Sequence, residues 1–338
     1  MGRRALPRLD PRERVVTVSI AMCTYNGSLF LSEQLASLMA QERLPDELVV
    51  CDDCSSDNTV DILREFAEDA PFPVLIYENK IRLKSTKNFE QAIALCQGDL
   101  ILLCDQDDIW DTQKVSLTEQ CFKKNERVSL VFSDAEVVGE DGSPLGYTLW
   151  ESLRLDQDLQ ARIKTSEAFE ILNFRPLVTG STMGFRKEFR DLVLPIPGGI
   201  TLIHDGWIAL MISLTGVLDL IDRTLMKYRQ HPRQQLGAPE NNRANPDAGF
   251  MANAQRRNGY ETEIEKLEAV RERVRSQGSR YHFSPKIDLD GRLKHLQQRL
   301  TISELRLKRI PMVFEELVTG RYHRYSNGLY SLFKDLAQ

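Results

Sequence analysis

Three acidic side chains stand directly after an apolar segment of this chain. Residues 100–104 read LILLC, and Asp105, Asp107 and Asp108 follow within four positions. Carboxylates gathered at the end of a buried strand repel one another unless a cation lies between them. The pattern therefore predicts a bound divalent metal or a polyhydroxy ligand at this point. The alternative is an acidic surface turn that caps the following helix.

Polar side chains also follow two other apolar segments. Residues 24–26 read TYN after the first segment, and residues 52–59 read DDCSSDNT after the second. Asp53 is suited to accept hydrogen bonds from a nucleotide base, and Tyr25 to lie against a base or a ribose. Part of the second segment is also suited to cap the helix that follows it.

Strand and helix patterns alternate along the part of the chain that carries these residues. Apolar and β-branched runs predict strands at residues 15–21, 48–51, 74–77, 100–104 and 130–133. Apolar residues at helical spacing lie between them. This order predicts an α/β fold with a Rossmann-like, mostly parallel sheet and helices on both faces. Ligands of such sheets bind beyond the carboxyl ends of the strands, so the polar segments are expected to meet there.

Composition excludes several classes of protein. The chain has 338 residues, 42% of them hydrophobic, and a formal net charge of −5, which argues against a nucleic-acid binder. The basic start at residues 1–14 is predicted to be a disordered leader, since no apolar segment of signal-peptide type follows it. The longest nearly uncharged run, residues 206–218, is too short to cross a bilayer. We expect a cytoplasmic protein, soluble or peripheral at a membrane.

The polar segments together resemble a known family. No G-x-G-x-x-G or G-x-x-x-x-G-K-[ST] motif is present, which excludes the usual dinucleotide and P-loop sites. Thr24, Tyr25 and Asn26, with residues 52–59 and the D-Q-D of residues 105–107, resemble the motifs of family 2 inverting glycosyltransferases with the GT-A fold. Residues 104–110 (CDQDDIW) and 87–89 (KNF) are similar to the bacterial rhamnosyltransferase-type members.

The resemblance continues toward the C-terminus. Residues 175–186 (RPLVTGSTMGFR) are similar to the family's central loop, where Thr179 and Gly180 would border the donor sugar and the acceptor. Residues 203–207 (IHDGW) resemble the H-D-x-W variant of its acceptor-site motif, which makes Asp205 the expected general base. Residues 226–236 (MKYRQHPRQQL) are similar to the Y-R-x-H segment that closes over the diphosphate.

The resemblance implies a role for each matching residue. Asp107 would hold Mg²⁺ or Mn²⁺, and Asp105 would lie near the ribose or the metal. His231 would ligate the metal or bind the diphosphate, and Arg229 precedes it in the same basic stretch. Four further residues carry two interpretations each: Lys87 would pair with a phosphate or stay solvated, His204 would orient a substrate or serve the structure, and Trp110 and Trp207 would form sugar platforms or pack in the core.

Two positions differ from the family pattern. Relatives tend to have Asn-Leu-Gly where residues 82–84 read RLK, and the loss of that glycine predicts a changed loop path. Gly206 stands where a bulkier aromatic is frequent, which predicts a wider acceptor side. Both departures concern the choice of substrate more than the type of reaction.

The chain changes character after residue 236. Residues 237–259 have the composition of a mobile loop or linker, and residues 260–338 are predicted to form a C-terminal helical extension after the GT-A domain of residues 15–236. Leu329, Leu332, Phe333 and Leu336 share one face of the last predicted helix. That face is suited to rest on a membrane or to dock onto the catalytic domain or a second copy of the chain.

The resemblance thus implies metal-dependent, inverting transfer of a sugar from a nucleotide-sugar donor of dTDP-rhamnose or UDP-hexose type. The acceptor would be a hydroxyl of a glycan or a lipid-linked saccharide in cell-surface polysaccharide synthesis. One alternative is a sugar nucleotidyltransferase, although the chain lacks a glycine-rich basic loop after the first strand. A second alternative is a non-catalytic nucleotide-sugar-binding module, which would not need Asp205.

Overall fold

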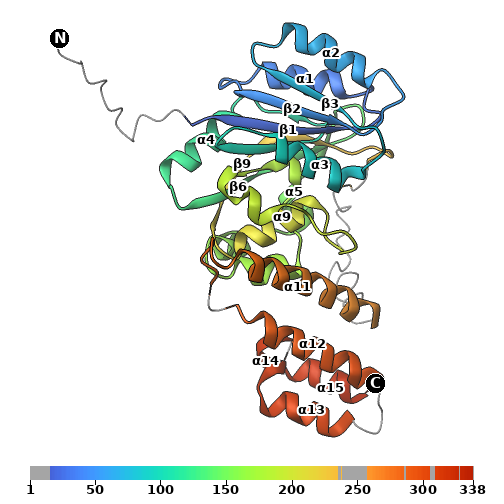
Figure 1. Ribbon diagram of the computed structural model, residues 1–338, viewed down its shortest axis with the longest axis vertical. Helices are drawn as coiled ribbons and strands as arrows, with labels where there is room; N and C mark the ends of the chain where they lie inside the picture. Colours follow the sequence, from blue (N-terminus) through green and yellow to red (C-terminus); the bar gives the residue numbers. More distant parts are fainter. Residues whose placement is uncertain are drawn as a thin grey trace, which may run out of the picture.

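A computed structural model describes residues 16–234, 237, 257–284, 287–304, 309–326 and 328–337 (Figure 1). The predicted leader lies outside this part, as does nearly all of the predicted loop of residues 237–259. Nine strands of the described residues form one sheet in the order β3-β2-β1-β4-β8-β6-β9-β5, with β7 beside β6. Their bounds are β1 Val18–Thr24, β2 Glu47–Asp52, β3 Val74–Glu78, β4 Leu100–Cys104, β5 Ile109–Trp110, β6 Val128–Val138, β7 Pro144–Thr148, β8 Met183–Arg186 and β9 Val217–Arg229.

The first half of the sheet is parallel and brings the polar segments together. Strands β2 and β4 flank β1, with Thr24 opposite Asp52 and Met22 opposite Cys104. The carboxyl ends of these three strands therefore lie level, as the alternation of strands and helices predicted. Strand β1 ends three residues later than predicted because Thr24 continues the ladder beside Asp52.

The second half of the sheet is mixed. Strand β8 runs antiparallel between β4 and β6, while β6 and β9 are parallel to each other. The short strand β5 pairs with the end of β9, with Ile109 opposite Lys227 and Trp110 opposite Met226. This pairing brings the basic end of β9 beside the aspartates that follow β4.

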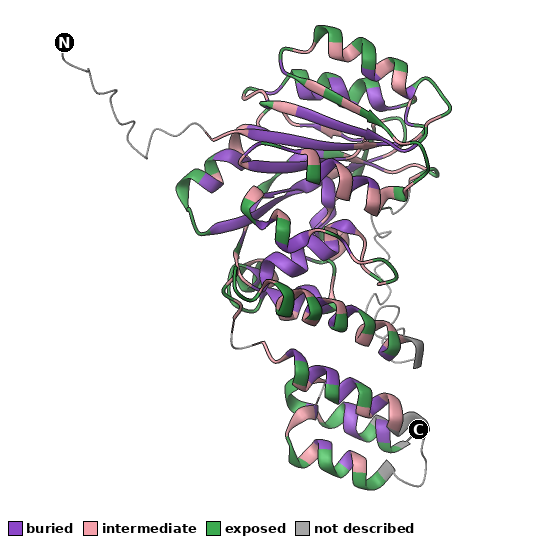
Figure 2. Ribbon diagram, viewed as in Figure 1, coloured by how far each residue is buried: buried purple, intermediate pink, exposed green. Residues whose placement is uncertain are grey.

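Helices cover both faces of the sheet, as predicted. Alternate strand residues such as Ile20 and Met22 pack against α1, α2 and α4, whereas Ala21 packs on the other face with α3 and α9. Figure 1 shows α1 and α2 above the sheet and α9 and α11 below it, and Figure 2 shows the sheet buried between them. The helices up to this point are α1 Leu31–Met39, α2 Thr59–Asp69, α3 Lys84–Leu95, α4 Lys114–Lys124, α5 Leu149–Leu153, α6 Gln157–Ile163, α7 Ala168–Phe174, α8 Arg190–Val193 and α9 His204–Ser213.

Five helices of the C-terminal part follow: α11 Arg257–Gln277, α12 Leu289–Glu304, α13 Arg309–Val318, α14 Arg321–Tyr325 and α15 Leu329–Ala337. Leu267 and Val270 of α11 join the core below the sheet, and Lys266 Nζ donates a hydrogen bond of 2.6 Å to the carbonyl of Asn173. A separate small core lies between α13, α14 and α15. The domain boundaries at residues 236 and 260 stay predictions, because residues 238–256 lie outside the described part.

Candidate active site

The loops after β1 and β2 are tied together by side-chain hydrogen bonds. Thr24 Oγ1 donates to Asp52 Oδ1 over 2.8 Å, and Asp52 Oδ2 accepts the N–H of Ser55 over 2.8 Å. The N–H of Asn26 then donates to Ser55 Oγ over 2.8 Å. Two of the polar segments therefore form one framework rather than separate helix caps.

The glutamine of the D-Q-D segment joins this framework to the loop after β4. Gln106 Oε1 accepts the N–H of Tyr25 over 2.8 Å, and Gln106 Nε2 donates to the carbonyl of Tyr25 over 3.1 Å. A Cβ atom on Gly27 would lie 2.2 Å from Gln106 Oε1, so only glycine leaves room for this amide. No pattern in the sequence predicted this contact between Gln106 and Tyr25.

Asp53 is buried and holds the loop that precedes α3. Its carboxylate accepts the N–H groups of Leu83 and Lys84 over 2.6 and 2.8 Å, and the amide of Asn79 over 3.0 Å. Lys84 has a φ of 64°, in the left-handed region that glycine favours, so lysine here keeps a glycine-type backbone. The guanidinium of Arg82 lies 3.8 Å above the ring of Tyr25 and covers one face of it.

The strained position of Lys84 gives a stability prediction. We expect Lys84→Gly to raise the free energy of unfolding by about 0.5–1 kcal/mol, since the relief of left-handed strain exceeds the extra chain entropy of glycine. Urea unfolding measures the difference. Lys80→Gly is the matched control, because Lys80 in the same loop is not among the residues with positive φ. A Lys84→Gly protein no more stable than the wild type would contradict strain at this position.

The aspartates after β4 form a cluster in which negative charge is disfavoured. Burial, followed by the charges of Asp107 and Asp205, raises the pKa of Asp105 to about 7. Asp108 is fully buried, and burial with the charges of Asp107 and Asp105 raises its pKa well above the usual value. Asp108 Oδ1 accepts the N–H of Arg229 over 3.2 Å, while Oδ2 has no hydrogen-bond partner in the described part of the chain.

A buried lysine lies among these carboxylates. Lys114, in the first turn of α4, donates from Nζ to the carbonyl of Ser181 over 2.8 Å. Burial lowers the pKa of Lys114 to about 8, although the charges of Cys104, Asp108 and Asp105 oppose the shift. Lys114 is not among the residues predicted from the sequence. The available signal was a lysine six positions after Asp108 at the start of a helix, which alone indicates a solvated side chain.

The end of β9 brings His231 to Asp107. His231 Nε2 lies 2.9 Å from Asp107 Oδ2, and the N–H of Arg233 donates to His231 Nδ1 over 3.3 Å. Because Nδ1 accepts a hydrogen bond, the proton of the neutral ring lies on Nε2 and is donated to Asp107. The ring also packs on Phe30, with 4.8 Å between the ring centroids. The predicted proximity of His231 to the aspartates is therefore present in the structure.

The residues of this cluster fit a divalent cation whose coordination shell is completed by the substrate. No group of three or more His, Cys, Asp or Glu side chains among the described residues forms a metal site by itself. A carboxylate and an imidazole are both able to ligate Mn²⁺, and Asp107 and His231 lie side by side in this cluster. Substrate phosphates and water usually fill the remaining positions around such an ion.

Asp205 lies at the start of α9, opposite the central loop. Its Oδ2 accepts the N–H of Gly180 over 3.1 Å and its Oδ1 the N–H of Gly206 over 2.6 Å. The positive end of the helix dipole also favours a carboxylate in this first turn. His204 is buried beside it and stacks on Phe89 with 4.1 Å between ring centroids, and burial lowers the pKa of His204. A Cβ atom on Gly180 would lie 3.0 Å from His204 Nε2.

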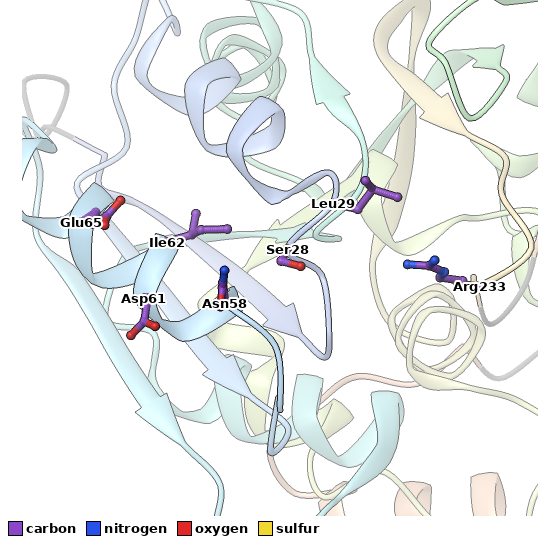
Figure 3. Close-up of a pocket in the computed structure, with 7 residues that line it drawn as sticks. All are labelled: Ser28, Leu29, Asn58, Asp61, Ile62, Glu65 and Arg233. Atoms are coloured by element: carbon purple, nitrogen blue, oxygen red, sulfur yellow. The ribbon is translucent and has the colours of Figure 1, made fainter.

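Beside these residues lies an open cavity of about 620 Å³, shown in Figure 3. It borders the loop after β1 and the start of α2, with Glu65 and Arg233 at opposite ends of the view. None of the clustered aspartates lines it; its lining residues are Ser28, Leu29, Asn58, Asp61, Ile62, Glu65 and Arg233. The cavity is therefore separate from the aspartate cluster, although Arg233 at its edge contacts His231.

Comparison with known sequences identifies the family. The family described as Glycosyl transferase family 2 matches residues 19–191, which is just over half of the chain and carries both the TYN and the DQD segments. The chain belongs to glycosyl transferase family 2. The recognition made from the sequence motifs is thereby confirmed.

Curated relatives of this glycosyltransferase come from several bacteria. An uncharacterised glycosyltransferase of Nostoc sp. is 25% identical over 222 residues, which cover 63% of this chain and 65% of the relative. The match thus spans less than two thirds of that relative's length. The dTDP-rhamnosyl transferase RfbG of Shigella flexneri is 28% identical, covering 64% of this chain and 74% of RfbG. An Escherichia coli enzyme, UDP-Glc:alpha-D-GlcNAc-diphosphoundecaprenol beta-1,3-glucosyltransferase WfgD, is 32% identical, covering 37% of this chain and 47% of WfgD.

A solved structure shares the fold. Residues 1–349 of Staphylococcus aureus TarS, in complex with UDP-GlcNAc, superpose with a TM-score of 0.52 and 17% sequence identity. The superposition covers 88% of this chain and 80% of the TarS chain. The GT-A fold predicted for the glycosyltransferase is therefore confirmed.

The structure shows what four of the proposed substrate-contacting residues bind or pack against. Trp207 is fully buried and donates from Nε1 to the carbonyl of Val193, and Trp110 is almost as buried, so neither presents a face to a sugar. Arg229 is also buried, and its guanidinium is used by the carbonyls of Asp107 and Glu140 and the carboxylate of Glu33. Lys87 Nζ binds Glu90 Oε2 and the carbonyl of Ile196, each over 2.7 Å.

Proposed function

We propose that this glycosyltransferase moves a sugar from a nucleoside diphosphate donor to a hydroxyl group of a glycan or lipid-linked saccharide in cell-surface polysaccharide synthesis. The observation that carries the proposal is the grouping of Asp105, Asp107 and His231 at the end of β4, with Asp205 close enough to raise the pKa of Asp105. Asp105, Asp107 and His231 are suited to bind a diphosphate and its cation. Asp205 is suited to accept a proton from a hydroxyl group. The names of RfbG and WfgD support donors of dTDP-rhamnose and UDP-hexose type.

The nucleoside would lie over the loops after β1 and β2. Thr24 and Asp53 are buried, with their side-chain oxygens engaged in protein hydrogen bonds, so they shape the floor of the site. The ring of Tyr25 would stack on the base once Arg82, which lies over one of its faces, moves aside. Asn26 is exposed beside it and is free to contact the ribose through its amide nitrogen.

The diphosphate would lie at the aspartate cluster. Asp107 and His231 are the residues suited to hold Mg²⁺ or Mn²⁺, with Asp105 nearer the ribose or the metal's surrounding water. When bound, the ion supplies positive charge that stabilises the departing diphosphate. Lys114 is close enough to interact electrostatically with Asp105 and Asp108, and Arg229 holds the backbone of Asp107 in place.

The acceptor would bind on the side of Asp205. A hydroxyl group directed at the anomeric carbon attacks it while its proton passes to the carboxylate of Asp205, and the bond to the diphosphate breaks. A single displacement of this kind inverts the anomeric centre and needs one carboxylate on the acceptor side. The N–H groups of Gly180 and Gly206 fix the orientation of that carboxylate before the acceptor arrives. Thr179 is half-buried next to Gly180, at the border of the donor sugar.

A panel of nucleotides tests the proposal. Thermal unfolding would be recorded with UDP, dTDP and GDP, each with and without Mn²⁺. A ligand that binds only the folded state at about 100 times its Kd adds ~2.7 kcal/mol, which corresponds to a shift of several degrees in Tm. We expect a metal-dependent shift with UDP or dTDP. No shift with any nucleotide in the presence of Mn²⁺ would contradict the proposal.

A further inference from the structure

Helix α13 carries an exposed apolar stripe. Ile310, Phe314 and Val318 recur every fourth residue, and their side chains are 73%, 64% and 69% exposed. Residues at this spacing lie along one side of a helix. Val313, in contrast, is buried in the small core beneath. Helix α13 therefore has apolar residues on its buried side and also on its exposed side.

Helix α15 repeats this arrangement. Leu332 is its buried apolar residue, whereas Leu329, Tyr330, Phe333 and Leu336 are exposed. Helices α13 and α15 contact each other through the core of Val313 and Leu332. Figure 1 places both helices at the end of the molecule farthest from the sheet, and Figure 2 shows much of their surface exposed. The two stripes, Ile310/Phe314/Val318 and Leu329/Tyr330/Phe333/Leu336, are called the apolar face below.

The apolar face is not needed to hold these helices together. Inside them, Arg299 makes two hydrogen bonds of 2.7 and 2.8 Å to Asp335, and the hydroxyl of Tyr322 donates to Asp335 over 2.9 Å. His295 lies between Glu316 and the hydroxyl of Ser326. The interior of this part is thus closed by a connected polar network, and the large apolar side chains left outside indicate an interaction surface.

Charge indicates what covers the apolar face. Residues 305–338 contain six Lys and Arg against three Asp and Glu, although the whole chain has a net charge of −5. Two of those three acids, Glu316 and Asp335, are buried in ion pairs with Arg321 and Arg299. Counted along the sequence, this segment therefore carries an excess of three positive charges. A second copy docked on the same face would oppose like charges, whereas an anionic surface would complement them.

We infer that the apolar face of α13 and α15 docks this enzyme onto a bilayer that contains anionic phospholipids. Exposed Phe, Tyr, Leu and Ile beside basic residues are typical of helices that lie in the membrane interface, with their apolar side chains at the boundary of the acyl region. Among the described residues, no helix has the length and apolar composition to cross a bilayer. The inference extends the proposed function by placing the enzyme at the surface where a lipid-linked acceptor lies.

Vesicle sedimentation tests the docking directly. The full chain would be mixed with vesicles of phosphatidylcholine containing about 30% phosphatidylglycerol, and with vesicles of phosphatidylcholine alone. We expect binding to the anionic vesicles and clearly weaker binding to the neutral ones. The double variant Phe314→Ser/Phe333→Ser should bind anionic vesicles at least ~10-fold more weakly, because two large apolar side chains are lost from the face. Leu145→Ser, an exposed leucine of β7, is the matched control and should bind like the wild type.

Two further outcomes would overturn the inference. Wild-type protein that binds neither type of vesicle would contradict it, as would a double variant that binds as tightly as the wild type. Light scattering without vesicles tests whether a second copy of the chain covers the face instead. If the wild type is a dimer and the double variant is a monomer, the face is a dimer interface and the inference is wrong. The proposed function stays separable, since the double variant should keep its nucleotide-dependent thermal shift and Asp205→Asn should keep vesicle binding.

Discussion

Replacement of Asp205 by Asn is expected to lower the rate of sugar transfer by at least ~100-fold, the usual contribution of a positioned general base. The carboxylate is the group placed to accept the proton of the acceptor hydroxyl, and an amide cannot accept it. Both carboxylate oxygens receive backbone N–H groups, from Gly180 and Gly206, so the loss of one of these hydrogen bonds should cost only about 1 kcal/mol of stability. Release of nucleoside diphosphate in the presence of acceptor measures the rate.

Controls separate this role from a structural one. Asp205→Asn should keep the metal-dependent thermal shift with nucleotide, because Asp107 and His231 are unchanged. Asp158→Asn, an exposed carboxylate on α6, should leave both the rate and the shift unaltered. A variant at Asp205 that transfers sugar at the wild-type rate would require another base, and one that loses nucleotide binding as well would indicate a role in building the site.

The edge of the sheet that carries the site could be predicted from the sequence, because it follows from the periodic pattern of apolar residues within each strand and helix. Alternating strand and helix patterns imply parallel strands, and parallel strands bring their carboxyl ends to one edge. Thr24 and Asp52 are 28 residues apart in the chain and hydrogen-bonded in the structure for this reason. The approach of His231 to Asp107 came from family resemblance instead, since no pattern in the sequence shows that β9 pairs with β5.

Trp207, Arg229 and Lys114 show that the position of a residue in the sequence does not determine what its side chain contacts. Trp207 lies two residues after Asp205, and two helical positions differ by about 200° around the axis, so the tryptophan faces the core when the carboxylate faces the site. Arg229 belongs to the Y-R-x-H segment, but Glu33 of α1 pairs with its guanidinium. Lys114 resembles any lysine in the first turn of a helix until burial beside Asp108 reveals its surroundings. The surroundings of all three residues depend on the direction of the side chain and on partners far away in the sequence.

The C-terminal helices were predictable as amphipathic segments, but not in their arrangement. Leu329, Leu332, Phe333 and Leu336 share one predicted face, yet the structure buries only Leu332 and leaves the other three exposed. The small core has room for few side chains, because polar pairs such as Arg299 with Asp335 occupy much of the interior. The number of apolar residues in a segment therefore overstates how many of them the fold can bury.

The second large effect is expected at Asp107 in the aspartate cluster, and it is measured as nucleotide binding, without an acceptor. Asp107 is the carboxylate that His231 contacts, and its charge contributes to the raised pKa values of both Asp105 and Asp108. Removal of that charge relieves repulsion in the free protein, so Asp107→Asn should be no less stable than the wild type without ligand. The same change removes a hard anionic ligand, which Mg²⁺ and Mn²⁺ prefer over an amide oxygen. Stability and ligand binding should therefore move in opposite directions.

Asp107→Asn is accordingly expected to weaken Mn²⁺-dependent binding of UDP or dTDP by at least ~100-fold, more than the 10- to 100-fold typical of residues that only support a metal ligand. His231→Gln should produce a smaller loss if the imidazole mainly orients Asp107. Isothermal titration with nucleotide, at fixed Mn²⁺ and in its absence, measures both. Equal nucleotide affinity in the wild type and the Asp107 variant would contradict a cation site at this cluster. A loss of affinity that occurs with Mn²⁺ and not without it would assign Asp107 as a ligand of the cation.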